Sequence, residues 1–109
     1  IFNNIEKQAP NIDIDILKKV LPKFIQELDH QYKLSYDKKI GIIMHLSGVI
    51  CSLVDNIPIP KKFNYKNIIL THKKTYEYLY DILEIIEEPF HIRFSDSDIA
   101  SLIMIIKEI

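Results

Sequence analysis

Apolar residues recur along most of this chain at the spacing of one helix face. Between Ile12 and Leu28 they stand three or four positions apart, with further apolar residues beside them. Similar stripes follow downstream, and no stretch alternates for long enough to favour a sheet. The pattern therefore predicts an all-α protein, a compact five-helix bundle. Its helices are expected near residues 12–31, 36–55, 64–71, 72–88 and 96–108.

Residues that cap or break helices mark the ends of these predicted elements. Ser35 and Ser95 each precede a stripe, and a serine hydroxyl can accept a hydrogen bond from a backbone amide of the first helical turn. The segment NIPIP (56–60) and Pro89 are expected to end two of the helices, because proline has no amide hydrogen to donate.

Pro22 interrupts the first stripe. Because its ring also disfavours helical geometry at the preceding residue, we expect a kink there or two short helices. Residues 1–11 (IFNNIEKQAPN) are polar and are predicted to be a linker or N-terminal arm. Residues 12–109 are predicted to form one domain. The chain does not begin with Met, so we expect it to be a piece of a longer protein.

The helix predicted at 36–55 contains both glycines of the chain, one on each side of His45. When its residues are placed about 100° apart, a broad apolar face forms on one side. The main members of that face are Ile43, Met44, Ile50, Leu53 and Val54. A narrow stripe of small and polar residues lies opposite and consists of Gly41, His45, Gly48, Ser52 and Asp55.

The two glycines need an explanation, because glycine within a helix costs about 0.5–1 kcal/mol relative to alanine. They could let another helix approach closely, in which case His45 is a hydrogen-bonded wedge between helices. They could instead leave the imidazole of His45 accessible to a large partner. The spacing of the residues leaves both explanations open.

The remaining candidate chemistry in the sequence is sparse. His30 is expected on the surface near a helix end, His72 at a junction between helices, and His91 in a turn. No two histidines have the spacing of metal ligands, and no cysteine cluster or phosphate-binding glycine loop is present. Glu84, Glu87 and Glu88 are expected to face solvent. We therefore predict no metal, no cofactor and no enzyme activity.

Charge and cysteine content narrow the choice of partners. The chain has 14 Lys and Arg against 15 Asp and Glu, and its lysine pairs are spread out, which argues against a nucleic-acid surface. The single cysteine, Cys51, is typical of a reducing cytoplasm. The apolar runs are far shorter than the roughly 20 residues that a membrane span requires, and no signal peptide is seen.

Residues 41–53 (GIIMHLSGVICSL) resemble the first histidine motif of the phosphotransferase-system regulation domain, or PRD, which reads G-L-I-x-H-L-A-x-x-I-x-R-L. Residues 63–92 are similar to the middle and fourth helices of that family. Residues 94–106 (FSDSDIASLIMII) are similar to its closing segment, I-x-x-x-E-x-x-Y-L-x-L-H-I. The likeness covers about residues 12–109 and is nearest to the PRDs of LevR-type transcriptional activators.

The resemblance implies a five-helix regulatory domain of a bacterial transcriptional regulator in the cytoplasm, active as a homodimer. In this family the histidine-containing phosphocarrier or an enzyme IIB transfers a phosphoryl group to the motif histidines, which changes dimerisation and the activity of attached domains. The match implies that His45 is the phosphoacceptor, with Gly41, Gly48 and Ser52 around it. It also implies that the domain itself binds no nucleic acid, and from the short apolar runs we expect no membrane partner.

Three positions depart from the family pattern. The second motif histidine falls on Ile105, the arginine of the first motif falls on Ser52, and the aromatic residue of the closing segment falls on Ser101. At most one family phosphorylation site therefore remains. Two alternatives stay open beside the regulatory phosphoacceptor: a degenerate PRD that acts only as a structural dimerisation module, and an enzyme IIA-like phosphoryl carrier.

Overall fold

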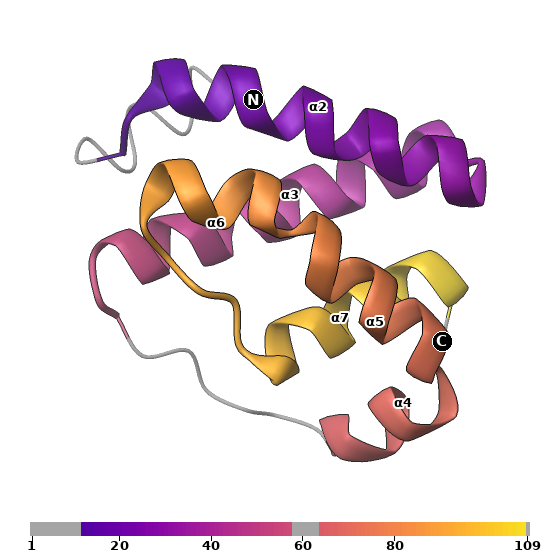
Figure 1. The fold of residues 1–109 in the computed structure, drawn as a ribbon. Coiled ribbons are helices and arrows are strands. Elements are labelled where there is room, and N and C mark those ends of the chain that lie inside the picture. The colour runs from indigo at the N-terminus through magenta and orange to yellow at the C-terminus, as the bar shows by residue number, and fades with distance from the viewer. Residues whose placement is uncertain (1–11, 58–63, 109) are drawn as a thin grey trace.

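The computed structural model describes residues 12–57 and 64–108, and within these ranges the chain forms helices and no strand (Figure 1). The prediction of an all-α helical bundle is confirmed. The helices are α2 (Ile14–Tyr32), α3 (Tyr36–Val54), α4 (Tyr65–Thr71), α5 (Lys73–Ile82), α6 (Glu84–Phe90) and α7 (Asp96–Lys107).

The helix expected at 72–88 corresponds to α5 and α6 together. The two are separated by Leu83, whose backbone is itself helical. The hydrogen bonds continue across the break, because Leu83 N donates to Leu79 O at 2.9 Å and Glu87 N donates to Leu83 O at 2.9 Å. Counted as one helical stretch, α5 and α6 bring the helical elements within residues 12–57 and 64–108 to the expected five.

Helix α2 runs unbroken through Pro22, so of the two outcomes expected there, a kink or two short helices, the second is wrong. Pro22 lies on the exposed side of α2, and so does Lys18, whose carbonyl loses its hydrogen-bond partner at this point. Water can hydrate that carbonyl, while six buried residues on the opposite side hold the helix in place. Those residues are Leu17, Val20, Leu21, Phe24, Ile25 and Leu28.

The helices pack mainly in pairs. Helix α2 packs on α6 and α3 packs on α7, while α4 and α5 both contact α7. Figure 1 shows α2 along the top of the molecule and α4 at the bottom. The radius of gyration of 13.3 Å matches the value of about 13 Å expected for a folded domain of 100 residues. Fully buried side chains at the centre include Phe24, Ile42, Leu46, Ile50, Leu79, Ile86 and Leu102.

The predicted apolar face of α3 is rotated relative to the face that the bundle buries. Met44 was placed on the buried side, but 63% of it is exposed. The buried residues are Ile42, Leu46, Ser47, Val49 and Ile50. The reason is that α7 packs along the side of α3 that carries Gly41 and His45, which moves the centre of the contact away from Met44.

The expected helix caps at Ser35 and Ser95 are confirmed. The Ser35 hydroxyl accepts a hydrogen bond from Lys38 N at 3.2 Å, and Ser95 forms a reciprocal capping box at the start of α7. The predicted arm at residues 1–11 and the prolines of NIPIP (56–60) lie outside the described residues, as do residues 58–63 in general.

Candidate functional site

The site around His45 is built by the antiparallel pairing of α3 with α7. Lys38 Nζ donates a hydrogen bond to Ile106 O at 2.9 Å, at the start of α3 and the end of α7. One turn further along α3, a Cβ atom added to Gly41 would lie 3.8 Å from Cγ2 of Ile105. His45 lies one turn beyond Gly41 on the same side of α3, and the backbone and carboxylate of Asp98, in the first turn of α7, both act on its imidazole.

His45 is half-buried in this contact. Its Nε2 atom is shielded from solvent and has no hydrogen-bond partner among the described residues. Burial lowers the pKa of His45 from its usual 6.5, because it disfavours the charged imidazolium, and the carboxylate and backbone of Asp98 partly oppose this shift. At pH 7 the imidazole is therefore mostly neutral, with one ring nitrogen carrying a free lone pair.

Asp98 supplies a fixed negative charge next to this imidazole. Only 5% of the residue is exposed. Its Oδ2 atom accepts hydrogen bonds from the backbone amide of Ser95 at 3.0 Å and from the Ser95 hydroxyl at 2.8 Å. The Ser95 hydroxyl in turn accepts a bond from Asp98 N at 3.2 Å. These three bonds hold the carboxylate and cap α7 at the same time.

The sequence pattern alone did not single out Asp98. A signal was nevertheless present. In the closing motif I-x-x-x-E-x-x-Y-L-x-L-H-I, the glutamate aligns with Asp98 when the histidine aligns with Ile105. This acid lies two turns before the second motif histidine. The motif alignment could therefore have indicated that it packs near the helix that carries the first motif histidine.

The rest of the predicted stripe on α3 divides between two environments. Gly41 faces α7, where a Cβ would make an ordinary contact with Ile105. A Cβ on Gly48 would meet nothing within 4 Å in the part of the chain that the structure describes. Ser52 is half-buried and Asp55 is exposed. Neither glycine is thus needed for close helix approach, and the surface one turn beyond His45 is open.

The structure brings the two histidine positions of the family motifs onto facing helices. His45 occupies the first, and Ile105, next to Gly41, occupies the second. Ser101, at the position of the family aromatic, is half-buried and donates its hydroxyl hydrogen to Ser97 O at 3.1 Å. The pair of positions therefore holds one imidazole instead of two.

The remaining predicted candidates lie where the sequence placed them. His30 is exposed in the last turn of α2, His72 joins α4 to α5, and His91 ends α6 in a left-handed conformation. Glu84 and Glu88 are exposed, as expected. Glu87 is different, because it is half-buried and its Oε2 accepts a hydrogen bond from Phe94 N at 2.8 Å.

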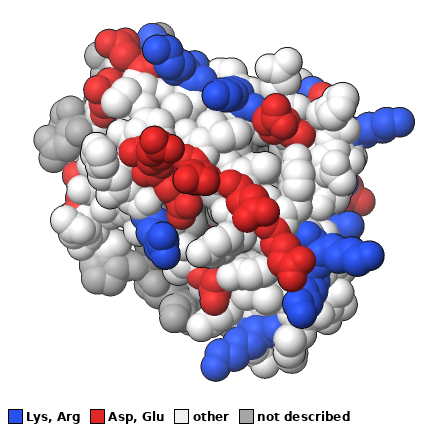
Figure 2. Space-filling model, in the orientation of Figure 1, with Lys and Arg blue, Asp and Glu red and all other residues white. Residues whose placement is uncertain are grey.

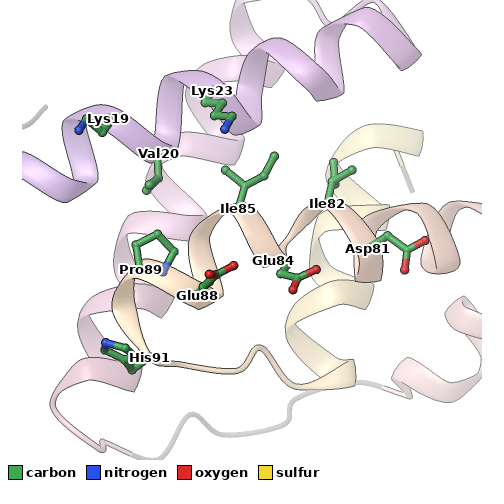
Figure 3. A pocket seen from close by; sticks show the side chains of 10 residues that line it. All are labelled: Lys19, Val20, Lys23, Asp81, Ile82, Glu84, Ile85, Glu88, Pro89 and His91. Atoms are coloured by element: carbon green, nitrogen blue, oxygen red, sulfur yellow. The ribbon is translucent and has the colours of Figure 1, made fainter.

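Away from the His45 site, a hollow lies between α2 and α6 and has a volume of about 820 Å³ (Figure 3). Lys19 and Lys23 form one wall, while Glu84 and Glu88 form the other. None of the lining residues belongs to the stripe that contains His45. Figure 2 shows acidic side chains in a band across this face, with basic side chains on either side. The residues that line the hollow are Lys19, Val20, Lys23, Asp81, Ile82, Glu84, Ile85, Glu88, Pro89 and His91.

The described ranges, 12–57 and 64–108, contain no group of three or more His, Cys, Asp or Glu side chains that could hold a metal ion. No helix in them combines the length and the apolar character that a membrane span requires.

Comparison with protein families gives a match to the PRD domain over residues 18–109. Comparisons with curated proteins and with solved structures gave no match. The family match covers most of the chain and includes α3 with His45, the α7 segment with Asp98, and the helices between them. PRD domains are regulatory rather than catalytic. The chain belongs to the PRD family, the regulatory domains that are controlled through the phosphotransferase system.

Proposed function

We propose that this chain is the phosphoacceptor domain of a bacterial, cytoplasmic transcriptional regulator and that His45 is its phosphorylation site. The donor is a protein of the sugar phosphotransferase system, either the histidine-containing phosphocarrier or an enzyme IIB. Phosphorylation changes dimerisation and so the activity of attached effector domains. One observation carries the proposal: a mostly neutral imidazole, with no partner for Nε2 among the described residues, at the histidine position of the first family motif.

The chemistry requires a nucleophilic ring nitrogen. The lone pair of the neutral imidazole attacks the phosphorus atom of the donor's phosphohistidine or phosphocysteine. A new N–P bond forms as the donor's N–P or S–P bond breaks, and the donor atom keeps the bonding electron pair. The lowered pKa of His45 keeps the nucleophilic form present at neutral pH.

Access to the ring depends on the open half of the stripe. Because Nε2 is shielded from solvent, the His45 side chain must turn outward before this atom can meet a donor protein. Gly48 leaves open space one turn further along α3. A donor can therefore approach from that side, whereas Ile105 and α7 close the other.

The family match and the substitutions lead us to expect a single site. An isoleucine has no atom that can accept a phosphoryl group, so Ile105 removes the second family position. The other histidines lie at helix ends and junctions outside the two motif positions. We expect one phosphoryl group per chain.

The test is phosphorylation by reconstituted phosphotransferase proteins from the same organism, with phosphoenolpyruvate as the phosphoryl source. The wild-type chain should take up one acid-labile phosphoryl group, and His45→Ala should take up none. Variants His30→Ala, His72→Ala and His91→Ala serve as matched controls and should be labelled like the wild type. Equal labelling of His45→Ala and wild type would refute His45 as the site.

Access can be tested without removing the nucleophile. Gly48→Leu places a branched side chain in the open space one turn beyond His45 and should slow labelling at least several-fold. Gly48→Ala has the same backbone constraint but little bulk, so it should be labelled at close to the wild-type rate. Circular dichroism of both variants shows whether the fold is preserved.

A second candidate function is a structural dimerisation module that is never phosphorylated. The burial of Nε2 and the isoleucine at position 105 favour it. This function predicts that the chain forms dimers in sedimentation experiments and takes up no label from any phosphocarrier or enzyme IIB. Uptake of label at His45 would exclude it.

A further inference from the structure

We propose that Asp98 is a positioning residue that couples the charge state of His45 to the start of α7. A negative charge gained at position 45 repels the Asp98 carboxylate and loosens the first turn of α7. This inference rests on the proposed function only for the origin of that charge, a phosphoryl group, and the coupling itself can be measured without phosphorylation.

The packing of α3 on α7 places the two side chains together. The contacts of Lys38 with Ile106 and of Gly41 with Ile105 set the antiparallel register, which directs His45 toward the N-terminal half of α7, where the backbone and carboxylate of Asp98 act on the imidazole. Asp98 is 5% exposed and Nε2 of His45 is fully shielded. Charges in such surroundings are screened far less by solvent than charges on the surface.

Lys38, a lysine of α3 that lies against α7, is occupied at the other end of that helix. Lys38 Nζ donates to Ile106 O at 2.9 Å and lies 3.4 Å from the Glu108 carboxylate, at the far end of α7. Ser52 stands where the family motif has arginine, so the usual cation on α3 is missing too. A new anion at position 45 therefore faces the Asp98 carboxylate without a compensating cation from these two positions.

The carboxylate cannot move away without a structural cost, because it is half of a capping box. Both the backbone amide and the hydroxyl of Ser95 donate to Asp98 Oδ2. If Asp98 turns away from the new charge, these donors lose their acceptor and the first turn of α7 frays. The hydroxyl of Tyr76 donates a hydrogen bond to Asp96 Oδ1 at 2.7 Å and so links α5 to α7. Fraying of the first turn of α7 would weaken this link as well.

The experiment compares His45→Glu with His45→Gln in the 109-residue chain, since these side chains differ in charge but hardly in shape. Backbone hydrogen exchange is measured by NMR at Asp98 and Ile99, whose amides bond to Ser95. We expect these amides to exchange about tenfold faster in His45→Glu, a typical size for coupling between neighbouring groups. Amides in the middle of α2 should exchange alike in both variants.

The matched control is the pair Ser52→Glu and Ser52→Gln, which adds the same charge at another half-buried position on α3, two turns from His45. This pair should leave exchange at Asp98 and Ile99 unchanged. Faster exchange in Ser52→Glu, equal to that in His45→Glu, would overturn the coupling, because any charge on α3 would then have the same effect.

Asp98→Asn completes the test, because it removes the charge and retains an oxygen acceptor for Ser95. In this background the difference between Glu and Gln at position 45 should shrink at least several-fold. If His45→Glu does not fold alone, Asp98→Asn must restore folding for the proposal to stand. An undiminished difference, or no rescue, overturns it.

Failure of this inference can be told apart from failure of the proposed function. If wild-type His45 accepts a phosphoryl group but the Glu and Gln variants behave alike, the phosphoacceptor function stands and the coupling through Asp98 falls. If the variants differ as expected but no label is taken up, the coupling stands and the phosphoacceptor function falls.

Discussion

The contact between α3 and α7 and the hollow between α2 and α6 both place ionisable side chains between two helices, yet they differ in how far those groups are removed from water. The hollow has two lysines on one wall and two glutamates on the other, all exposed. The α3–α7 contact has one half-buried histidine and one buried aspartate. Because exposed charges are hydrated and screened, many of them matter less than a single pair that is buried.

The comparison shows why the larger hollow is the weaker candidate for regulation. Adding or removing a charge among exposed lysines and glutamates changes their energy by a fraction of a kcal/mol. We expect a charge added at His45 to enter a contact that the bundle must open to accommodate it. On this reasoning it is burial, and not the volume of the hollow, that leads us to propose the α3–α7 contact as the part of the bundle that responds to modification.

The largest difference between the two regions should appear in stability. Leu102 is fully buried on α7, so Leu102→Ala should lower the free energy of unfolding by about 2–5 kcal/mol through lost burial and a residual cavity. Ile85 is half-buried at the hollow, and Ile85→Ala should cost only about 1 kcal/mol. Urea denaturation of both variants provides the measurement. Equal losses of unfolding free energy in the two variants would contradict the division into a packed contact and an open hollow.

A smaller effect of opposite sign is expected at Gly48. Gly48→Ala should raise the free energy of unfolding by about 0.5–1 kcal/mol, because alanine is the better helix former and its Cβ meets nothing within 4 Å among the described residues. Lys23→Ala, in the exposed wall of the hollow, is a control expected to stay within about 0.5 kcal/mol of the wild type. A loss of stability in Gly48→Ala would mean that this side of α3 is covered.

The smallest effect that we expect is a dependence of stability on pH. Burial lowers the pKa of His45 below 6.5 in the folded chain, so the unfolded chain takes up this proton first as the pH falls. The contribution of His45 is fully present above pH 6.5 and is lost as the pH falls through the folded pKa. His45→Gln should remove this component, seen as a shallower decline in unfolding free energy between neutral and mildly acidic pH. An equally steep decline in the variant would assign the effect to other groups.

The sequence by itself determined where the helices of this protein form, and it identified His45 as the candidate functional residue. Apolar spacing located the helical stretches, and Ser35 and Ser95 marked two starts, because capping and amphipathic burial are local effects. The glycines around His45 and the family motifs singled out that histidine. Pro22 shows the limit of local reasoning, because packing of the buried side of α2 keeps the helix continuous where the local pattern also allowed two short helices.

Only the tertiary structure decided which side of α3 is buried and what lies next to His45. The helical wheel placed Met44 inside, but the position of α7 leaves it exposed. The proximity of Asp98 to His45 and the burial of Nε2 both depend on the register of two helices that are far apart in the sequence. Such a register results from the packing of all the helices together, and the pattern of a single helix carries no information about its partner.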